Sequence, residues 1–341
     1  MATNIPAEEW KEWGRLVDQL NVQALVEEQD TRVVNATDTM IDALGLFAAH
    51  DVLSAPVYDA TCNGFVGLID MLDLVAFLCR FSGSLGGTKR LEREQLNLDA
   101  LKHQLASLNE DQRAQIRATP VTALIGLSVS VKTPGQTLVK LLTDPNTHRI
   151  PITAEEGDQF LGILSQLDLA KWLHQHRESV PKVPQYLLAS MKAKSLRGLV
   201  VRDFASPGAK KEMVTVPSHA TMIEALLKID EHKVSALPVV DVQGYLKGTI
   251  SASDIKKLKL EPSDQPEEML QKMFVPVSYC LTGSPLTCTM DHSLEDVLGA
   301  MTANKVHRVW TVDSNNKPVG VVSLCDVLAQ FVPPTPESYL T

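Results

Sequence analysis

Four aspartates end four similar apolar segments of the sequence, and each could either start a helix or hold a ligand. The segments are residues 67–73, 162–168, 248–254 and 320–326, so the aspartates are Asp73, Asp168, Asp254 and Asp326. In GVVSLCDV, Asp326 stands three residues after Ser323, which is the sequence form of a capping box at a helix start. A carboxylate can also accept hydrogen bonds from two adjacent ribose hydroxyls. The residues alone leave both roles open.

Two His-Arg pairs could supply the complementary chemistry. His148-Arg149 and His307-Arg308 come directly before apolar stretches that read as strands. Arg presents a planar fork of donors that suits phosphate, and His adds a donor whose charge can change near neutral pH. A solvated pair at a strand start is the ordinary explanation, so phosphate binding is the alternative that the rest of the sequence must support.

The aspartates belong to a larger internal repeat. Each follows, at a nearly constant distance, an apolar set with helical spacing. Between this helical set and the aspartate lie two apolar stretches joined by a polar turn, and one extended segment precedes the helical set. Each unit is therefore predicted to be strand, helix, strand, strand, helix. Units of about fifty residues bury little surface alone, and we expect them to form two pairs. The helical sets are Met40/Ala43/Leu44/Phe47, Leu138/Leu141/Leu142, Met222/Ala225/Leu226/Ile229 and Leu294/Val297/Leu298/Met301.

The repeat also predicts the domain boundaries. Residues 92–117 are expected to form a solvated helix, and residues 82–89 (SGSLGGTK) lack the Gly-Lys-Ser/Thr order of a phosphate loop and read as linker. The expected segments are an N-terminal extension with an amphipathic helix (1–30), repeat 1 (31–80), a linker (81–127), repeat 2 (128–177), a linker (178–211), repeat 3 (212–260), a linker (261–284), repeat 4 (285–332) and a tail (333–341).

In the N-terminal extension, apolar side chains share one helical face. They are Trp10, Trp13, Leu16, Val17 and Leu20. Such a face could anchor a partner, but packing on the chain's own surface is the favoured reading.

Composition excludes several classes of protein. The chain has 341 residues, a net charge of −9 and 44% hydrophobic residues, which is typical of a globular protein and argues against a general nucleic-acid binder. No apolar stretch approaches the roughly 20 residues that span a bilayer, and the N-terminus lacks a signal pattern, so we expect an intracellular protein. The five cysteines form no C-x-x-C pair and read as reduced thiols, so no metal site is expected.

The four units resemble CBS domains, the modules named after cystathionine β-synthase. Four in one chain resemble the gamma subunit of AMP-activated protein kinase. The resemblance covers residues 31–332 and is carried by HKVSALPVVD (232–241), KVHRVWTVD (305–313), THRIP (147–151), FVGLIDMLDLVAFL (65–78) and GVVSLCDV. It implies an α+β fold of four β-α-β-β-α repeats, arranged as two Bateman modules that form a pseudo-symmetric disc.

The resemblance also implies a ligand site in the clefts between repeats. Gamma subunits bind AMP, ADP or ATP there, with the motif aspartate on the ribose and His and Arg on the phosphates. Carried onto this sequence, the ribose-binding residues are Asp73, Asp168, Asp254 and Asp326, the phosphate-binding residues are His148, Arg149, Lys233, His307 and Arg308, and the nearby hydroxyl donors are Ser235 and Ser323. No obligatory cofactor and no catalytic residue is implied.

Four positions depart from the gamma pattern. Leu53 stands where an arginine is usual, which removes one phosphate contact, and Lys233 keeps a charge but loses the arginine fork. Asp70 replaces the serine of the other repeats, a change that should preserve capping. Asp168 is acidic where animal gamma subunits usually carry a basic residue, so a cleft that is often empty in the family could be used here.

Two functions follow from the resemblance. The first is a non-catalytic regulatory subunit that binds AMP, ADP or ATP and controls a kinase catalytic subunit through a scaffold subunit. The alternative is a free-standing CBS protein that forms a homodimer and binds an adenosyl ligand, such as ATP, AMP or S-adenosylmethionine, to regulate another enzyme or a transporter. Neither involves nucleic acid, and the expected location is the cytoplasm, with the nucleus as a second site.

Overall fold

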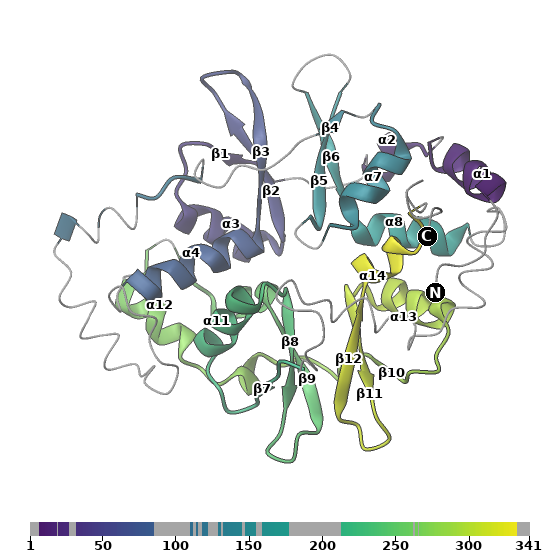
Figure 1. Ribbon diagram of the computed structural model, residues 1–341. Coiled ribbons are helices and arrows are strands. Elements are labelled where there is room, and N and C mark those ends of the chain that lie inside the picture. The colour runs from purple at the N-terminus through teal and green to yellow at the C-terminus, as the bar shows by residue number, and fades with distance from the viewer. Residues whose placement is uncertain are drawn as a thin grey trace. The chain divides into compact units, whose positions relative to one another are not determined.

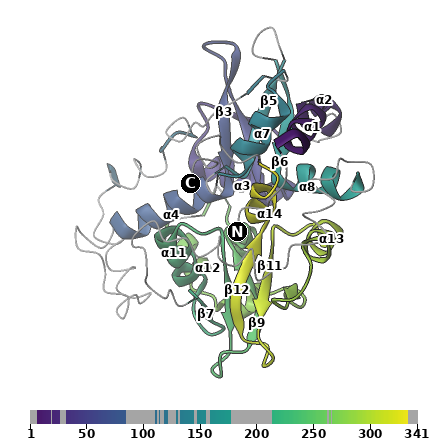
Figure 2. The same ribbon diagram turned by 45° about the vertical axis from the view of Figure 1, so that its right-hand side comes forward.

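A computed structural model gives the fold of the chain (Figures 1 and 2). It describes residues 7–18, 20–26, 32–84, 110–111, 114, 118–121, 129–130, 132–144, 147–154, 159–176, 213–261, 263–264 and 266–332. The linker 178–211, the tail 333–341 and most of the linker 81–127, with its predicted solvated helix, lie outside these residues.

All four repeats have the predicted order of elements. Repeat 1 has β1 (Val34–Asn35), α3 (Met40–His50), β2 (Ser54–Asp59), β3 (Gly64–Asp70) and α4 (Met71–Ser84). Repeat 2 has β4 (Val129–Ser130), α7 (Gly135–Leu142), β5 (Arg149–Thr153), β6 (Phe160–Ser165) and α8 (Gln166–Gln175). Repeat 3 has β7 (Val216–Pro217), α11 (Met222–His232), β8 (Ala236–Val240), β9 (Leu246–Ser251) and the 3-10 helix η3 (Ala252–Leu258). Repeat 4 has β10 (Thr287–Cys288), α13 (Leu294–Asn304), β11 (Arg308–Val312), β12 (Pro318–Ser323) and α14 (Leu324–Ala329).

Each repeat forms its own three-stranded sheet with one topology. A two-residue first strand runs parallel to the second strand, and the third strand runs antiparallel to the second. The parallel pair is joined through the first helix of the repeat, as a parallel connection requires. The antiparallel pair places the start of the second strand beside the end of the third, where the last helix begins. This register positions the candidate site.

Two compact units each combine alternate repeats. Repeats 1 and 3 form one unit, within Asp30–Ser128 and Val214–Ser284, and repeats 2 and 4 form the other with the N-terminal helices, within Met1–Gln29, Val129–Met213 and Pro285–Thr341. We call them the 1/3 unit and the 2/4 unit. In the first, α4 packs on α11 and η3, and in the second, α8 packs on α13 and α14. The predicted α+β class with four repeats is confirmed, and the arrangement of a disc stays a prediction.

A separate apolar core stabilises each unit. The core of the 1/3 unit includes Phe47, Ile69 and Ile250, and it extends to α12 (Pro266–Met273) and the 3-10 helix η4 (Val277–Cys280). The core of the 2/4 unit includes Leu142 and Leu328. Phe47 and Leu142 belong to the predicted helical sets, Ile69 and Ile250 lie on strands, and Leu328 lies on the last helix of repeat 4. Their burial is the main driving force for folding.

The N-terminal helices α1 (Ala7–Asp18) and α2 (Val22–Val26) belong to the 2/4 unit, beside α7 and β6 (Figures 1 and 2). Trp13 is buried, and its indole N–H donates to the carbonyl oxygen of Phe331 at 2.8 Å. Gly135 lets α7 approach α1 closely, since a Cβ at position 135 would lie 1.9 Å from the carbonyl oxygen of Val17 on α1. The apolar face of α1 therefore packs on this chain.

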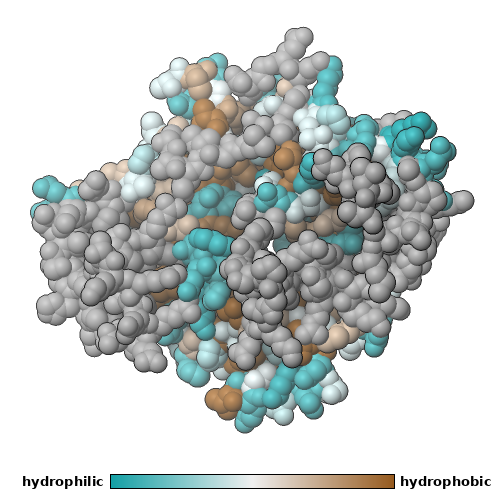
Figure 3. Space-filling model, in the orientation of Figure 1, coloured by the Kyte–Doolittle hydropathy of each residue, from teal (hydrophilic) through white to brown (hydrophobic). Residues whose placement is uncertain are grey.

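Some large apolar side chains are exposed on the described part of the chain. The coloured surface in Figure 3 mixes hydrophilic and hydrophobic residues. The exposed large apolar side chains are Val33, Val234, Val242, Tyr245 and Tyr279. Within the described ranges, no helix has the length and apolar character needed to cross a membrane.

Candidate nucleotide site

The sheets bring each His-Arg pair to the start of a helix. Arg149 pairs with Ser165 across β5 and β6, and Arg308 pairs with Ser323 across β11 and β12. The adjacent backbone bonds are alike, because the carbonyl oxygen of each histidine accepts from the first amide of the helix: Gln166 donates to His148 at 3.2 Å, and Leu324 donates to His307 at 3.0 Å. A cation and a helix N-terminus therefore lie together in repeats 2 and 4, an arrangement that favours anions.

The motif aspartates cap their helices with one carboxylate oxygen. Oδ2 of Asp168 accepts from the amide of Ser165 at 3.0 Å and from its hydroxyl at 2.6 Å. Oδ2 of Asp326 accepts from the amide of Ser323 at 2.8 Å and from its hydroxyl. In the described part of the chain, no other residue donates to Oδ1 of Asp168 or Asp326. Capping and ligand binding are therefore compatible, since they use different oxygens.

In repeat 1 the aspartate at the serine position preserves the cap. Oδ1 of Asp70 accepts from the amides of Leu72 at 2.8 Å and Asp73 at 3.1 Å. Oδ2 of Asp73 accepts from the amide of Asp70 at 2.9 Å. The substitution of Ser by Asp thus leaves the helix start intact, as the sequence predicts.

Basic side chains from repeats 2 and 4 act on His307 in the 2/4 unit. Burial, and then the charges of Arg149, Arg308, His148 and Lys171, lower the pKa of His307 to about 3. We call these five residues the cationic cluster. The imidazole is neutral at pH 7, because another positive charge there would be both desolvated and repelled. Such a concentration of positive charge is suited to a multiply charged anion such as phosphate.

Lys171 of this cluster is not paired with the motif aspartate of its own helix. Asp168 and Lys171 are three residues apart on α8, and no ion pair joins them in the described chain. Burial raises the pKa of Asp326, although its hydrogen bonds with Ser323 oppose the rise. The carboxylate of Asp326 is thus kept in a partly buried position next to a helix start.

The neighbouring thiol is not a candidate nucleophile. Sγ of Cys325 donates to the carbonyl oxygen of Thr143 at 2.8 Å. Burial, followed by the charges of Asp326 and Asp144, raises the pKa of Cys325 to about 12. The thiol therefore stays protonated at neutral pH, and a reactive cysteine needs the thiolate.

The other predicted site residues belong to the 1/3 unit. Nζ of Lys233 is 2.8 Å from Oδ1 of Asp230, and its side chain is 74% exposed. Ser235 and Ala236 occupy the positions that correspond to a His-Arg pair, as Leu53 and Ser54 do in repeat 1. The strand starts of this unit therefore carry no cation of the kind found in repeats 2 and 4.

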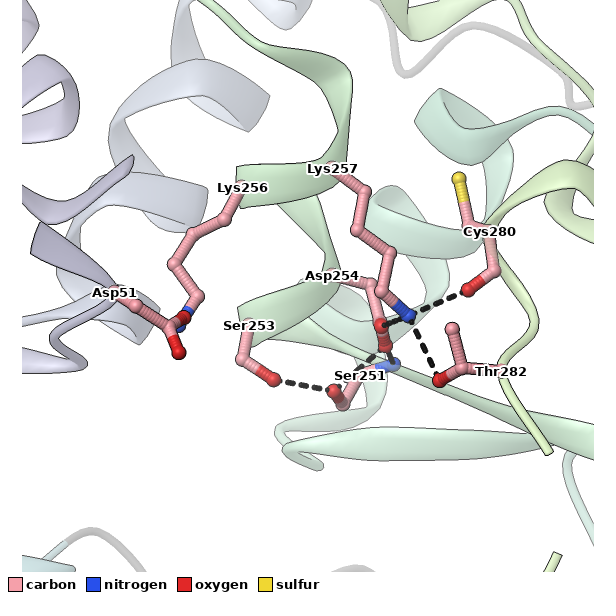
Figure 4. A network of polar contacts seen from close by, with 8 residues as sticks. All are labelled: Asp51, Ser251, Ser253, Asp254, Lys256, Lys257, Cys280 and Thr282. Atoms are coloured by element: carbon pink, nitrogen blue, oxygen red, sulfur yellow. Dashed lines mark hydrogen bonds and ion pairs between the residues drawn. The ribbon is translucent and has the colours of Figure 1, made fainter. Parts of the chain in front are cut away.

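Asp254 of repeat 3 differs from Asp168 and Asp326 (Figure 4). Its Oδ2 accepts from the amide of Ser251 at 2.7 Å and from its hydroxyl at 2.8 Å, as in a cap. Its Oδ1 lies 2.6 Å from Nζ of Lys257. One carboxylate oxygen thus caps the helix and the other is held in an ion pair.

Two lysines of the site were not predicted from the sequence. Lys171 and Lys257 both stand three residues after a motif aspartate, in repeats 2 and 3. The shared spacing was a signal that could have indicated them, since a residue three positions along a helix lies near the first.

The described residues contain no group of three or more His, Cys, Asp or Glu side chains that could bind a metal ion.

Comparison with known protein families identifies the repeats. The model of the CBS domain matches residues 27–80, 118–175, 192–261 and 277–332. The chain belongs to the CBS-domain family. The four CBS repeats that match are the four units of the sequence pattern.

Curated relatives include regulatory kinase subunits. The CBS protein is 26% identical over 304 residues to the human 5′-AMP-activated protein kinase subunit gamma-3. The matched region covers 86% of this chain and 56% of the relative. It is 25% identical over 301 residues to the gamma subunit of Dictyostelium discoideum, covering 85% and 48%. It is also 24% identical over 307 residues to protein SDS23 of Saccharomyces cerevisiae, covering 86% and 55%. The resemblance to gamma subunits is confirmed, and the chain spans about half the length of these relatives.

A solved structure shares the fold. Protein MJ1225 from Methanocaldococcus jannaschii, described as a candidate archaeal homolog of the AMPK gamma subunit, superposes with a TM-score of 0.65 at 18% identity. The match covers 92% of this chain and all of MJ1225. At this identity the similarity concerns the fold.

Proposed function

We propose that this CBS protein is a non-catalytic regulatory subunit that binds AMP, ADP or ATP and controls a partner protein kinase. The observation that carries the proposal is the cationic cluster, with four positively charged or ionisable neighbours around a neutral His307. The relatives include gamma subunits of AMP-activated protein kinase. This similarity supports an adenine nucleotide as the ligand and a protein kinase as the partner.

The chemistry of a nucleotide fits the two groups of residues in the 2/4 unit. Phosphate oxygens would accept from Arg149, Arg308 and Lys171, which are strong charge-assisted donors. Ribose hydroxyls would donate to Oδ1 of Asp168 or Asp326, which capping leaves open. AMP, ADP and ATP share the ribose and differ in phosphate number, so the cationic cluster is the part of the site that could distinguish them.

Regulation would act through a shift between conformations. A nucleotide can favour one arrangement of the repeats only by binding it more tightly than the other, and a kinase bound to that arrangement would respond by the same coupling. The proposal assigns no catalytic role, because the sequence contains neither the H-R-D and D-F-G motifs nor the Gly-rich loop of a kinase. We expect the protein in the cytoplasm, with kinase catalytic and scaffold subunits as partners.

Calorimetry tests the ligand. We expect the purified full chain to bind AMP, ADP or ATP, and binding to weaken steeply for adenosine, which lacks the phosphates. No heat of binding with any adenine nucleotide at millimolar concentration would refute the proposal.

Affinity purification tests the partner. The tagged chain, recovered from the cells that produce it, should bring down a kinase catalytic subunit and a scaffold subunit. Recovery of a homodimer alone would contradict the kinase part of the proposal and favour a free-standing CBS protein.

A further inference from the structure

In repeat 3 an internal lysine already occupies the motif carboxylate. The side chain of Asp254 is only 12% exposed, and its Oδ1 lies 2.6 Å from Nζ of Lys257. The same Nζ donates to the carbonyl oxygen of Cys280 at 2.6 Å and to the hydroxyl of Thr282 at 3.3 Å. Figure 4 shows the lysine pointing into this set of acceptors. Three protein oxygens therefore hold the ammonium group against the oxygen that a ribose would need.

Repeat 2 contains the same two residue types at the same spacing without the ion pair. Asp168 and Lys171 lie on α8, an α-helix, whereas Asp254 and Lys257 lie on η3, a 3-10 helix. Residues three apart eclipse one another in a 3-10 helix, but in an α-helix with 3.6 residues per turn they are offset around the axis. The 3-10 geometry of η3 aligns Lys257 more directly with its aspartate, whereas Lys171 on an α-helix is offset from Asp168 and contributes to the field at His307.

A ribose at Asp254 would have to displace this lysine, and no His-Arg pair stands at the strand starts of the 1/3 unit to offset that loss. The strand starts of the 1/3 unit carry Leu53, Ser54, Ser235 and Ala236 in place of the His-Arg pairs. A ligand phosphate would therefore gain little that offsets the loss of the ion pair between Asp254 and Lys257. Loss of a charge-assisted hydrogen bond corresponds to about a tenfold or greater loss of affinity.

We propose that Lys257 determines specificity in repeat 3: its ammonium group occupies the carboxylate that would bind ribose, so this repeat excludes nucleotides while repeats with an open aspartate bind them. The inference rests on the proposed function, because it concerns which repeats take the nucleotide. In the other repeats the residue three positions after the motif aspartate is Ala76, Lys171 or Ala329. The alanines cannot form an ion pair, and in the described chain Lys171 forms none with Asp168.

Stoichiometry by calorimetry tests this role, with AMP and adenosine as probes and the full chain as the protein. Lys257→Met removes the ammonium group and keeps the length of the side chain. We expect it to bind one more equivalent of probe than the wild type, and a further Asp254→Asn change should abolish the gain. Lys256→Met is the matched control, because Lys256 lies on the same helix but pairs with Asp51 at 2.5 Å, and it should bind as the wild type does.

Unchanged or reduced stoichiometry in Lys257→Met, with a wild type that binds AMP, would overturn the role of Lys257 and leave the proposed function standing. A wild type that binds none of AMP, ADP and ATP at millimolar concentration would refute the proposed function and the inference together. If circular dichroism shows that Lys257→Met does not fold, Asp254→Asn in the otherwise unchanged chain is decisive. We expect wild-type stoichiometry from that variant, and loss of one equivalent would overturn the inference.

Discussion

Burial and the guanidinium group of Arg149, which comes from another repeat, hold the pKa of His307 at about 3. Arg308, His148 and Lys171 add to the effect. The side chains that act on the imidazole are all basic, and the imidazole itself is neutral at pH 7. Negative charge placed here would favour the protonated imidazole, because an opposite charge nearby raises the pKa of a histidine.

The first prediction is that AMP raises the pKa of His307. The phosphate would offset the charges that lower it, whereas adenosine, which has no phosphate, should leave it unchanged. The pH dependence of the imidazole resonances of His307, followed by NMR with AMP, with adenosine and without ligand, measures the shift. An equal titration in all three samples would show that phosphate does not bind beside His307.

A second prediction concerns stability at acid pH. The pKa of His307 is about 3 in the folded state, against an ordinary value of 6.5, so the unfolded chain binds the extra proton as the pH falls below 6.5. Stability is therefore lost toward acid, by about 2 kcal/mol from this residue at pH 5. Urea unfolding at pH 7 and pH 5 should show a smaller loss for His307→Gln than for the wild type. The same pH dependence in both proteins would contradict the low pKa.

The repeat pattern predicted the elements of the fold because the helical spacing, the polar turns and the apolar strands recur together in every repeat. Helical sets such as Met222 to Ile229, a polar turn and an apolar strand recur in order, and the structure contains the elements in that order. The fold of each repeat follows from local pattern and burial. The combination of alternate repeats depends on helix packing between distant segments, as α8 with α13, which local pattern does not encode.

The candidate site was predictable only in part, for a related reason. Asp326 and the His-Arg pairs could be named because the motif repeats. The ion pair of Lys257 could not, since it depends on η3 being a 3-10 helix and on the position of Cys280 and Thr282. Lys233 kept the expected type of charge, but its exposed side chain reaches Asp230 on its own helix. Its predicted contact with phosphate stays a prediction.

A third prediction separates Arg149 from Lys233. Arg149→Met removes a charge that acts on His307, so we expect AMP affinity to fall about tenfold or more, as for loss of a charge-assisted bond. Lys233→Met removes the same charge from a side chain that is 74% exposed and paired with Asp230, and we expect little change. Calorimetric titration with AMP compares the two variants. Equal losses would mean that net charge, rather than the cationic cluster, sets the affinity.

The last prediction separates capping from ligand binding at Asp326. Asp296 is a matched control, because it stands in the same repeat and also closes a capping box, with Oδ2 accepting from the amide of Ser293 at 3.1 Å and from its hydroxyl at 2.6 Å. Asp326→Asn and Asp296→Asn should each cost at most about 1 kcal/mol of stability. If Oδ1 of Asp326 binds ribose, only Asp326→Asn should weaken AMP binding, by about tenfold or more, since a charged acceptor is lost. Thermal unfolding and calorimetry on both variants measure the two effects, and an unchanged AMP affinity in Asp326→Asn would reduce this aspartate to a cap.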